Sequence, residues 1–224
     1  MPDIPAASSL DLGNSMKKPQ TPVESSVSRR SFLGSALAVA VTGLQLKPTF
    51  AAAKGRRGGH PQVYLLRGLA NVFSTGLDEI GRRLRVAGVD AHVQSFMAWR
   101  SASNKIVAER QKFGRSPVIL VGHSLGANAI ISLAQALEKS GIRVDYMASF
   151  AATSPSPLPA NITRVVNFYF SSQSWGAALT KGPGFRGRLE NRDLSHDLHV
   201  NHFNIEKQRT LQDEVVKDIL RALR

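Results

Sequence analysis

From residue 62 onward, hydrophobic and polar positions follow two patterns in alternation. Short apolar runs rich in β-branched and aromatic residues predict strands over 62–66, 90–95, 118–121, 144–150 and 165–170. Apolar positions at helical spacing predict helices from 74 or 75 to 87, then over 101–112, 125–139 and 211–222. Strands that alternate with helices predict an α/β fold, with a doubly wound, mostly parallel sheet flanked by helices.

The helix ends carry their own signals. Ser74 or Thr75 is expected to cap the first helix, because a hydroxyl there can accept one of the unpaired backbone N–H groups. Gly88 is expected to end that helix, and Gly141 is expected to end the helix over 125–139.

Residues 1–53 follow neither pattern. Residues 1–27 are polar and rich in Ser and Pro, so they are expected to be disordered. In residues 28–53, Arg29-Arg30 precedes a short apolar stretch and then small residues typical of a cleavage site. This order predicts a twin-arginine export signal. A permanent membrane anchor is the weaker interpretation, because a membrane-spanning helix needs roughly 20 strongly apolar residues and this stretch is shorter. We therefore expect recognition by the twin-arginine export machinery and a periplasmic or secreted protein.

Residues 54–224 remain for the folded part, which is enough to bury a full core in one ordinary domain. The 224-residue chain is 42% hydrophobic with scattered Gly and Pro, which excludes fibrous and fully disordered proteins. It contains no cysteine, which excludes disulfides, a thiolate nucleophile and cysteine-based metal centres. We expect a monomer with no cofactor.

The net charge of +13 raises the question of nucleic-acid binding. The basic residues are dispersed and mixed with acidic ones, with no run of five or six and no aromatic–basic interleaving that would stack bases. Specific nucleic-acid binding is therefore not expected. A basic surface that favours anionic envelope surfaces is the preferred interpretation.

The strongest chemical signal is Gly122-His123-Ser124-Leu125-Gly126, which matches G-x-S-x-G. It directly follows the apolar run at 118–121 and opens the helix predicted at Leu125. The chain must turn sharply there, and side chains at the two glycine positions would collide with the strand and the helix. Ser124 is the predicted nucleophile, and His123 is interpreted as a packing residue.

Residues 118–137, VILVGHSLGANAIISLAQAL, resemble the nucleophile elbow of α/β-hydrolases, particularly small lipases, esterases and thioesterases. The resemblance covers the strand–helix order of the whole folded part, but it is specific only at the elbow and a few loops. It implies an acyl-enzyme mechanism in which Ser124 attacks an ester-type carbonyl. The short segment between the strands predicted at 144–150 and 165–170 leaves no room for a large lid.

The resemblance also implies two oxyanion donors. The family has a loop after its first strand that usually begins His-Gly, and here Arg67-Gly68-Leu69 occupies it. The backbone N–H of Leu69 would then join that of Leu125. Arg67 replaces the usual histidine, which is compatible with a hole built from backbone donors. We expect its guanidinium to point into solvent, with contact to a substrate carboxylate or phosphate as the alternative.

The resemblance places the catalytic base immediately before the last helix. His202 occupies that position, and His199 is the next candidate. His196, His199 and His202 are spaced by three residues, which would permit a metal site. They do not share one helix face cleanly and no H-E-x-x-H motif accompanies them, so no metal is expected.

The acid that should orient the base is where the family pattern breaks. No Asp or Glu lies between Tyr146 and Leu189, the interval that contains both strand ends where the acid is sought. Asp193 is the predicted acid, and Asp197 and Glu190 are alternatives; Asp145 starts its strand and should lie at the wrong end of the sheet. A Ser–His dyad assisted by Gln173, a backbone carbonyl or water is also open.

The pattern as a whole predicts an exported single-domain serine hydrolase that cleaves carboxylic esters or thioesters of small-molecule or lipid-like acyl substrates. A catalytically weak or silent protein of the same fold, binding a lipid or an envelope partner, is the rival interpretation, favoured by the missing acid and by Arg67. A binder of anionic polymers is a third, which depends only on the net charge of +11 in residues 54–224.

Overall fold

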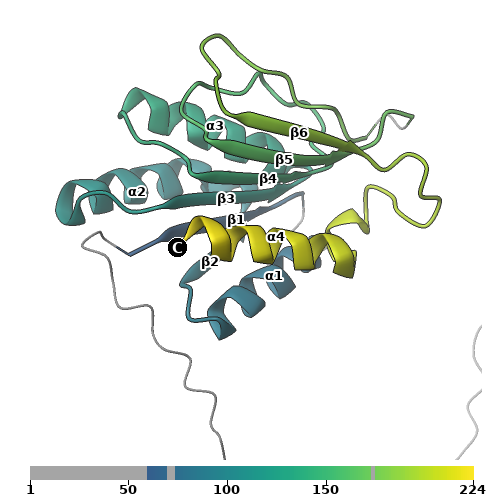
Figure 1. Ribbon diagram of the computed structural model, residues 1–224, viewed down its shortest axis with the longest axis horizontal. Coiled ribbons are helices and arrows are strands. Elements are labelled where there is room, and N and C mark those ends of the chain that lie inside the picture. Colours follow the sequence, from purple (N-terminus) through teal and green to yellow (C-terminus); the bar gives the residue numbers. More distant parts are fainter. Residues whose placement is uncertain (1–59, 70–73, 173–174) are drawn as a thin grey trace, which may run out of the picture. The chain divides into compact units, whose positions relative to one another are not determined.

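A computed structural model describes residues 60–69, 74–172 and 175–224. The segments predicted as disordered (1–27) and as an export signal (28–53) lie outside the described residues, as does Gln173. Six strands form one sheet in the order β2-β1-β3-β4-β5-β6, and all neighbouring strands are parallel (Figure 1). The predicted doubly wound parallel sheet flanked by helices is confirmed.

The strand order positions the site. From β1 the chain passes outward to β2 and then returns to β3 on the other side of β1, so the order reverses between β1 and β3. Ligands of open α/β sheets bind at the carboxyl ends of the strands beside such a reversal. The strands are β1 (Gln62–Arg67), β2 (Ala91–Ser95), β3 (Val118–His123), β4 (Tyr146–Phe150), β5 (Arg164–Tyr169) and β6 (Arg188–Asp193).

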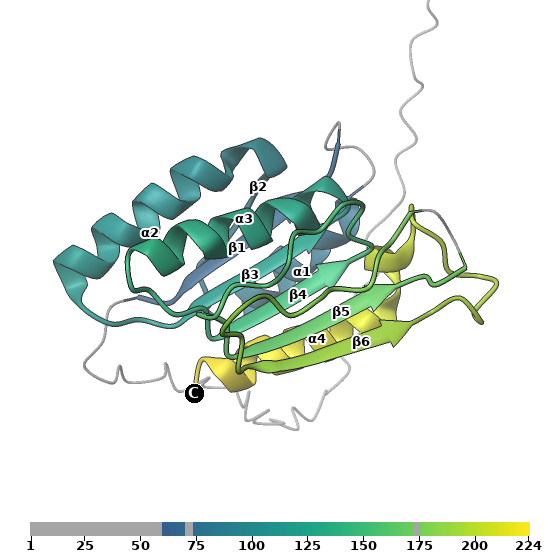
Figure 2. The ribbon, with the colours of Figure 1, turned by 90° about the horizontal axis from the view of Figure 1, so that it is seen from above.

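Four α-helices cover the two faces of the sheet in pairs. Helices α1 (Thr75–Val86) and α4 (Arg209–Ala222) lie on one face, and α2 (Trp99–Phe113) and α3 (Leu125–Lys139) lie on the other (Figure 2). Two short 3-10 helices, η1 (Phe96–Ala98) and η2 (Ile205–Lys207), precede α2 and α4. The boundaries of α3 are the predicted ones.

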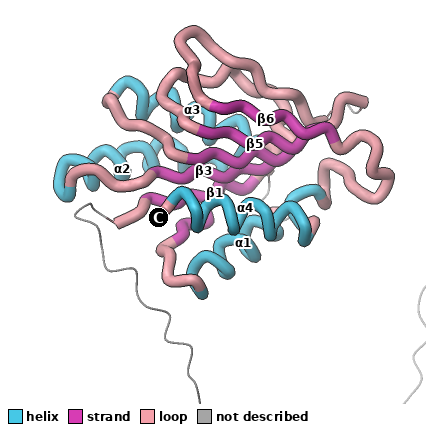
Figure 3. The backbone as a smooth tube through the Cα atoms, viewed as in Figure 1, coloured by secondary structure: helices cyan, strands magenta, loops and turns pink. Residues whose placement is uncertain are grey.

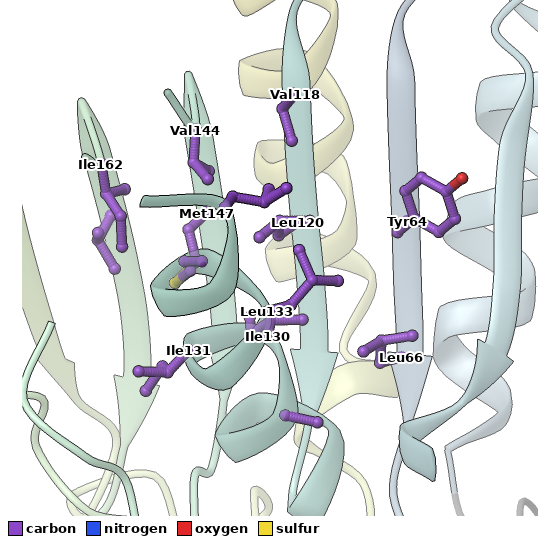
Figure 4. Close-up of a cluster of buried hydrophobic side chains, with 14 of the residues drawn as sticks. Tyr64, Leu66, Val118, Leu120, Ile130, Ile131, Leu133, Val144, Met147 and Ile162 are labelled. Carbon is purple, nitrogen blue, oxygen red and sulfur yellow. The ribbon is translucent and has the colours of Figure 1, made fainter. Parts of the chain in front are cut away.

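Alternation along the central strands divides the core into two clusters. In β1 and β3 the residues Tyr64, Leu66 and Leu120 pack with α2 and α3, as the close-up in Figure 4 shows for part of that cluster. Their neighbours Val63, Leu65 and Ile119 point to the opposite face and pack with α1 and α4. Both faces of these strands are buried, which explains why they read as continuous apolar runs.

Strand β6 was not predicted. Its sequence, RLENRD, has no apolar run, because the strand lies at the sheet edge and pairs only with β5. Ion pairs attach this strand to its surroundings. Arg192 pairs with Glu190 in the same strand and with Glu214 of α4.

The connection from β4 to β5, residues 151–163, contains no helix, and loops also join β5 to β6 in its described residues (Figure 3). The absence of a large lid between β4 and β5 agrees with the expectation from the sequence. Within the described ranges, no helix is both long and apolar enough to cross a membrane.

Candidate active site

Ser124 lies on a sharp turn between β3 and α3. Its backbone angles, φ 57° and ψ −121°, belong to a region that non-glycine residues rarely adopt and that costs on the order of 1–3 kcal/mol. The flanking glycines make the turn possible. A Cβ on Gly126 would lie 1.9 Å from the carbonyl oxygen of Leu66, and one on Gly122 would lie 2.4 Å from that of Gly126. The collisions predicted at both glycine positions are therefore present.

The structure brings the predicted nucleophile and the predicted base together. His202 lies in the loop before η2, and its Nε2 is 3.0 Å from the Oγ of Ser124. The backbone N–H of Ser124 donates to the carbonyl of Phe150 at 2.9 Å, which ties the elbow to the end of β4. Ser124 and His202 are both buried, at 9% and 5% exposure. This geometry allows the imidazole to accept the serine proton directly.

The second ring nitrogen of His202 faces a backbone carbonyl. Its Nδ1 lies 3.3 Å from the carbonyl oxygen of Trp175, which can only accept a hydrogen bond. Nδ1 therefore carries the proton and donates it, and Nε2 is left as the acceptor that a general base needs. Burial lowers the pKa of His202, opposed in part by the Trp175 carbonyl, and this keeps the ring neutral at pH 7.

Asp193, the predicted orienting acid, has other partners. It ends β6 and accepts hydrogen bonds from the backbone N–H groups and the hydroxyls of Ser171 and Ser195, with Ser195 Oγ at 2.6 Å. These bonds hold the pKa of Asp193 well below its usual range. Since Nδ1 of His202 is bonded to Trp175, the structure gives Asp193 the role of joining the ends of β5 and β6.

The alternative acids are also engaged elsewhere. Glu190 forms an ion pair with Arg192, and Asp197 is exposed and accepts the backbone N–H of His199. Asp145 accepts the N–H of Val118 at the start of β3, which confirms that it lies at the opposite end of the sheet. In the described part of the chain, no carboxylate forms a hydrogen bond with His202. The structure instead places a backbone carbonyl, that of Trp175, beside Nδ1 of His202. A backbone carbonyl is one of the partners that the sequence left open for a Ser–His dyad.

The loop at Arg67-Gly68-Leu69, called the oxyanion loop after its predicted role, lies against Ser124. A Cβ on Gly68 would be 3.0 Å from the Cβ of Ser124, so the end of β1 passes directly beside the elbow. The N–H of Gly68 is already bound by the hydroxyl of Ser74 at 2.9 Å. The next N–H in the loop, that of Leu69, therefore stays the predicted donor, together with that of Leu125 in the first turn of α3, where N–H groups lack helical partners.

The expectation that Arg67 points into solvent is wrong. Its guanidinium forms a two-pronged ion pair with Asp78 in the first turn of α1, with Nε 3.0 Å from Oδ2, and only 23% of its side chain is exposed. The planar guanidinium matches the two carboxylate oxygens, which explains the preference for this partner over water. Arg67 thus fastens the oxyanion loop to α1.

His123, interpreted from the sequence as a packing residue, has polar partners on both sides. Its Nδ1 lies 2.8 Å from the hydroxyl of Ser74, and its Nε2 lies 2.8 Å from the backbone carbonyl of His202. Ser74 is the N-cap residue of α1, one of the two predicted positions, but its hydroxyl makes no capping bond to the helix. The sequence could not reveal this contact of Ser74 with His123, because a serine directly before a helix usually caps that helix.

A buried carboxyl group lies behind His123. Glu206 of η2 is fully buried, and its Oε2 lies 3.8 Å from the Nε2 of His123. Neither of its carboxylate oxygens has a hydrogen-bond partner among the described residues. Burial raises the pKa of Glu206 to about 7, while burial lowers the pKa of His123 to about 4. Both groups are thus held toward their neutral forms.

Aromatic rings surround the base. The rings of Trp175 and Phe203 lie 5.2 Å from that of His202, each edge-on to it. His199, the second candidate for the base, is exposed, as is His196. No cluster of His, Cys, Asp or Glu in the described ranges could hold a metal ion. The two half-exposed aromatic rings thus pack against the buried imidazole.

The topology and the elbow make the fold α/β-hydrolase-like. No protein-family model matches the sequence, and no curated protein matches it. Solved structures match at low identity. A protein classed as a hydrolase of the alpha/beta superfamily, from Xanthomonas campestris pv. campestris, has 17% identity and a TM-score of 0.40, covering 74% of this chain and 99% of its own.

Two further structures are similar to this chain. A protein of unknown function from Agrobacterium tumefaciens has 18% identity and a TM-score of 0.41, with 75% of this chain and 95% of that protein covered. The type II thioesterase BorB from the borrelidin biosynthetic cluster has 14% identity and a TM-score of 0.46, with 75% of this chain and 96% of BorB covered. The evidence for an α/β-hydrolase-like fold in this chain is its own parallel sheet, with a serine elbow after β3 and a histidine before α4.

Proposed function

We propose that the protein is a serine hydrolase that cleaves carboxylic esters or thioesters with a Ser–His dyad. The observation that carries the proposal is the hydrogen bond between Ser124 Oγ and His202 Nε2, together with the bond from His202 Nδ1 to the carbonyl of Trp175. The first bond activates the hydroxyl. The second fixes the tautomer that can accept its proton.

The geometry supports a two-step acyl transfer. His202 takes the proton of Ser124 as Oγ attacks the carbonyl carbon, and the N–H groups of Leu125 and Leu69 stabilise the oxyanion that forms. Collapse of the tetrahedral intermediate expels an alkoxide or a thiolate, which takes the proton from His202 and departs as the alcohol or thiol. Water, deprotonated by the same histidine, then hydrolyses the acyl-enzyme and returns the enzyme to its starting state.

A carbonyl in place of the acid changes the energetics in one respect. Replacing the carboxylate of a triad by an amide costs on the order of 10⁴ in kcat, largely because the wrong tautomer is favoured. The Trp175 carbonyl favours the right tautomer but carries only a partial charge, so it stabilises the imidazolium less than a carboxylate does. We therefore expect a slow but genuine hydrolase.

Labelling by a fluorophosphonate probe tests this proposal, because the probe reacts only with an activated serine. The wild type and a Ser124→Ala variant of matched thermal stability are compared, followed by turnover of short-chain p-nitrophenyl esters and acyl thioesters. Labelling that depends on Ser124 supports the hydrolase. Equal labelling and turnover in both proteins would mean that the elbow is structural.

A second candidate function has one specific observation in its favour. Among the described residues no carboxylate forms a hydrogen bond or ion pair with His202, as expected of a protein of this fold that has lost its activity and binds a lipid or an envelope partner. Such a protein would show no serine labelling and no turnover in the same assay. It would still bind its acyl ligand after Ser124→Ala, because binding would not require the nucleophile.

We also propose that the protein is exported by the twin-arginine pathway and acts outside the cytoplasm. The support is the order of Arg29-Arg30, apolar stretch and small residues in the sequence. Replacement of Arg29 and Arg30 by lysine keeps the charge and should leave the precursor in the cytoplasm. An unchanged periplasmic yield would contradict this proposal.

A further inference from the structure

A chain of three hydrogen bonds runs through His123. The backbone N–H of Gly68 donates to Ser74 Oγ at 2.9 Å, Ser74 Oγ lies 2.8 Å from His123 Nδ1, and His123 Nε2 lies 2.8 Å from the backbone carbonyl of His202. Its two ends belong to the two loops that meet at Ser124: the oxyanion loop and the loop of the base.

The direction of each bond follows from the ends of the chain and from the neutral state of the buried ring. A backbone N–H can only donate and a carbonyl can only accept, so Nε2 of His123 must carry a proton for the bond to His202. A neutral imidazole then has a bare Nδ1, which accepts the hydroxyl proton of Ser74. Ser74 thus accepts from Gly68 and donates to His123. Of the two neutral tautomers, only the Nε2-protonated one makes both ring bonds. A charged ring could also donate to Ser74, whose hydroxyl oxygen has two lone pairs, but the 1% exposure of His123 disfavours the charge.

Two features set this arrangement apart from simple packing. Ser74 is the N-cap residue of α1 but uses its hydroxyl for His123, so α1 begins without a side-chain cap. A cap of this kind is worth about 1 kcal/mol. The rings of His123 and His202 are also only 5.1 Å apart, so a small shift of either backbone changes the approach of Nε2 to Ser124.

We propose that His123 is a positioning residue, which sets the relative positions of the oxyanion loop and the catalytic base through Ser74 and the His202 carbonyl. This inference rests on the proposed hydrolase function. His123 itself does not contact the reacting atoms. Loss of the chain should therefore lower kcat and leave KM nearly unchanged, because displacement of a base or donor by about 1 Å costs on the order of 100-fold in rate.

Histidine NMR tests the chain independently of any activity. The full chain contains six histidines, which ¹⁵N labelling of the imidazoles resolves, and the His123 signals are identified by their loss in His123→Gln. We expect His123 to be Nε2-protonated, with a bare Nδ1, from pH 5.5 to 8. An Nδ1-protonated ring, or titration of His123 near pH 6.5, would overturn the proposal even if the protein proves to have no hydrolase activity.

Conservative variants then separate the two arms of the chain. The amide of Gln can reach the position of Nε2 and donate to the His202 carbonyl, whereas the oxygen of Asn can reach the position of Nδ1 and accept from Ser74. Phe fills the ring volume and does neither. We expect His123→Phe and Ser74→Ala each to lower kcat about 10- to 100-fold at similar KM, and His123→Gln to recover part of the loss and to restore the His202 imidazole shifts.

The double variant and a matched control complete the test. Because His123 and Ser74 act in one chain, the double variant should lose no more activity than the worse single variant. His92→Phe is the control for the same exchange at a partly exposed site on the edge strand β2, and it should leave kcat unchanged. Multiplied losses in the double variant, or unchanged kcat and unchanged His202 shifts in a folded His123→Phe, would overturn the positioning role.

Discussion

The elbow and the histidine loop each supply one member of the Ser–His pair, but they are built differently. Ser124 follows β3, a strand buried over its whole length, and precedes a helix packed against the sheet. His202 belongs to a loop whose preceding residues 196–199 are exposed, and it is held by one bond from its ring to Trp175 and one to its carbonyl from His123.

The difference teaches which property each region controls. The elbow is part of the sheet, so damage to it changes the free energy of unfolding. The histidine loop is positioned by a few hydrogen bonds between loops, so damage there should change rates more than stability. The pair thus combines a nucleophile fixed by the core with a base adjusted by local contacts.

Gly126→Ala should have the largest effect. The new Cβ would lie 1.9 Å from the Leu66 carbonyl oxygen, so β1 and α3 must move apart. We expect the free energy of unfolding to fall by at least about 4 kcal/mol, which is exceptional for a single substitution, and this is measured by urea denaturation.

Gly88→Ala is the control for that prediction. Gly88 has a positive φ of 82° but open space around its Cβ position, so only backbone strain is added there, about 1–2 kcal/mol. Equal losses in the two variants would mean that the close packing of the elbow contributes little, and the contrast with the histidine loop would fail.

An intermediate effect is expected from Glu206→Gln. It is measured as a change in how the melting temperature depends on pH. The raised pKa of Glu206, about 7, makes stability fall as pH rises from 4.5 to 7, because the unfolded carboxyl ionises first. The lowered pKa of His123, about 4, makes stability rise with pH from 4 to 6.5. The two trends oppose one another over most of the range.

Glu206→Gln should therefore leave the rise due to His123 uncompensated. The melting temperature of the variant should climb from pH 5 to 6.5 relative to the wild type. At about 1.4 kcal/mol per pH unit, the difference in the free energy of unfolding over this range is about 2 kcal/mol. His123→Gln should tilt the curve the opposite way. The Nζ of Lys207 lies 3.9 Å from Oε1 of Glu206, and Lys207 is retained in all of these proteins. Parallel curves for wild type and Glu206→Gln would contradict the assigned shifts.

The sequence predicted the elbow side far better than the histidine side, for a physical reason. Buried strands and glycines next to a strained serine leave apolar runs and fixed spacings, so β3, Ser124 and α3 could be located. The edge strand β6 is polar and left no such signal. The carbonyl of Trp175 belongs to the backbone, which every residue has. His202 could be assigned from its place before α4, but what holds it could not.

The smallest effect is expected from Asp193→Asn, and it bears most directly on the comparison. The sequence predicts that Asp193 orients His202, in which case the variant would lower kcat by orders of magnitude. In the structure its carboxylate is instead bonded to Ser171 and Ser195. An amide oxygen can still accept most of these bonds, and its NH₂ can face a hydroxyl that reverses direction. We therefore expect kcat to change less than about threefold.

The remaining consequence for Asp193 is a matter of charge. Its pKa is lowered in the folded protein, so the carboxylate stabilises the fold above its ordinary pKa and loses that contribution as pH falls below it. Asp193→Asn should thus lower the melting temperature slightly at pH 7 and match the wild type at acidic pH. Asp197→Asn, at an exposed position in the same loop, is the matched control and should change neither quantity. A large fall in kcat for Asp193→Asn alone would restore Asp193 as the orienting acid, and the histidine loop would then have to rearrange on binding substrate to bring the carboxylate to Nδ1.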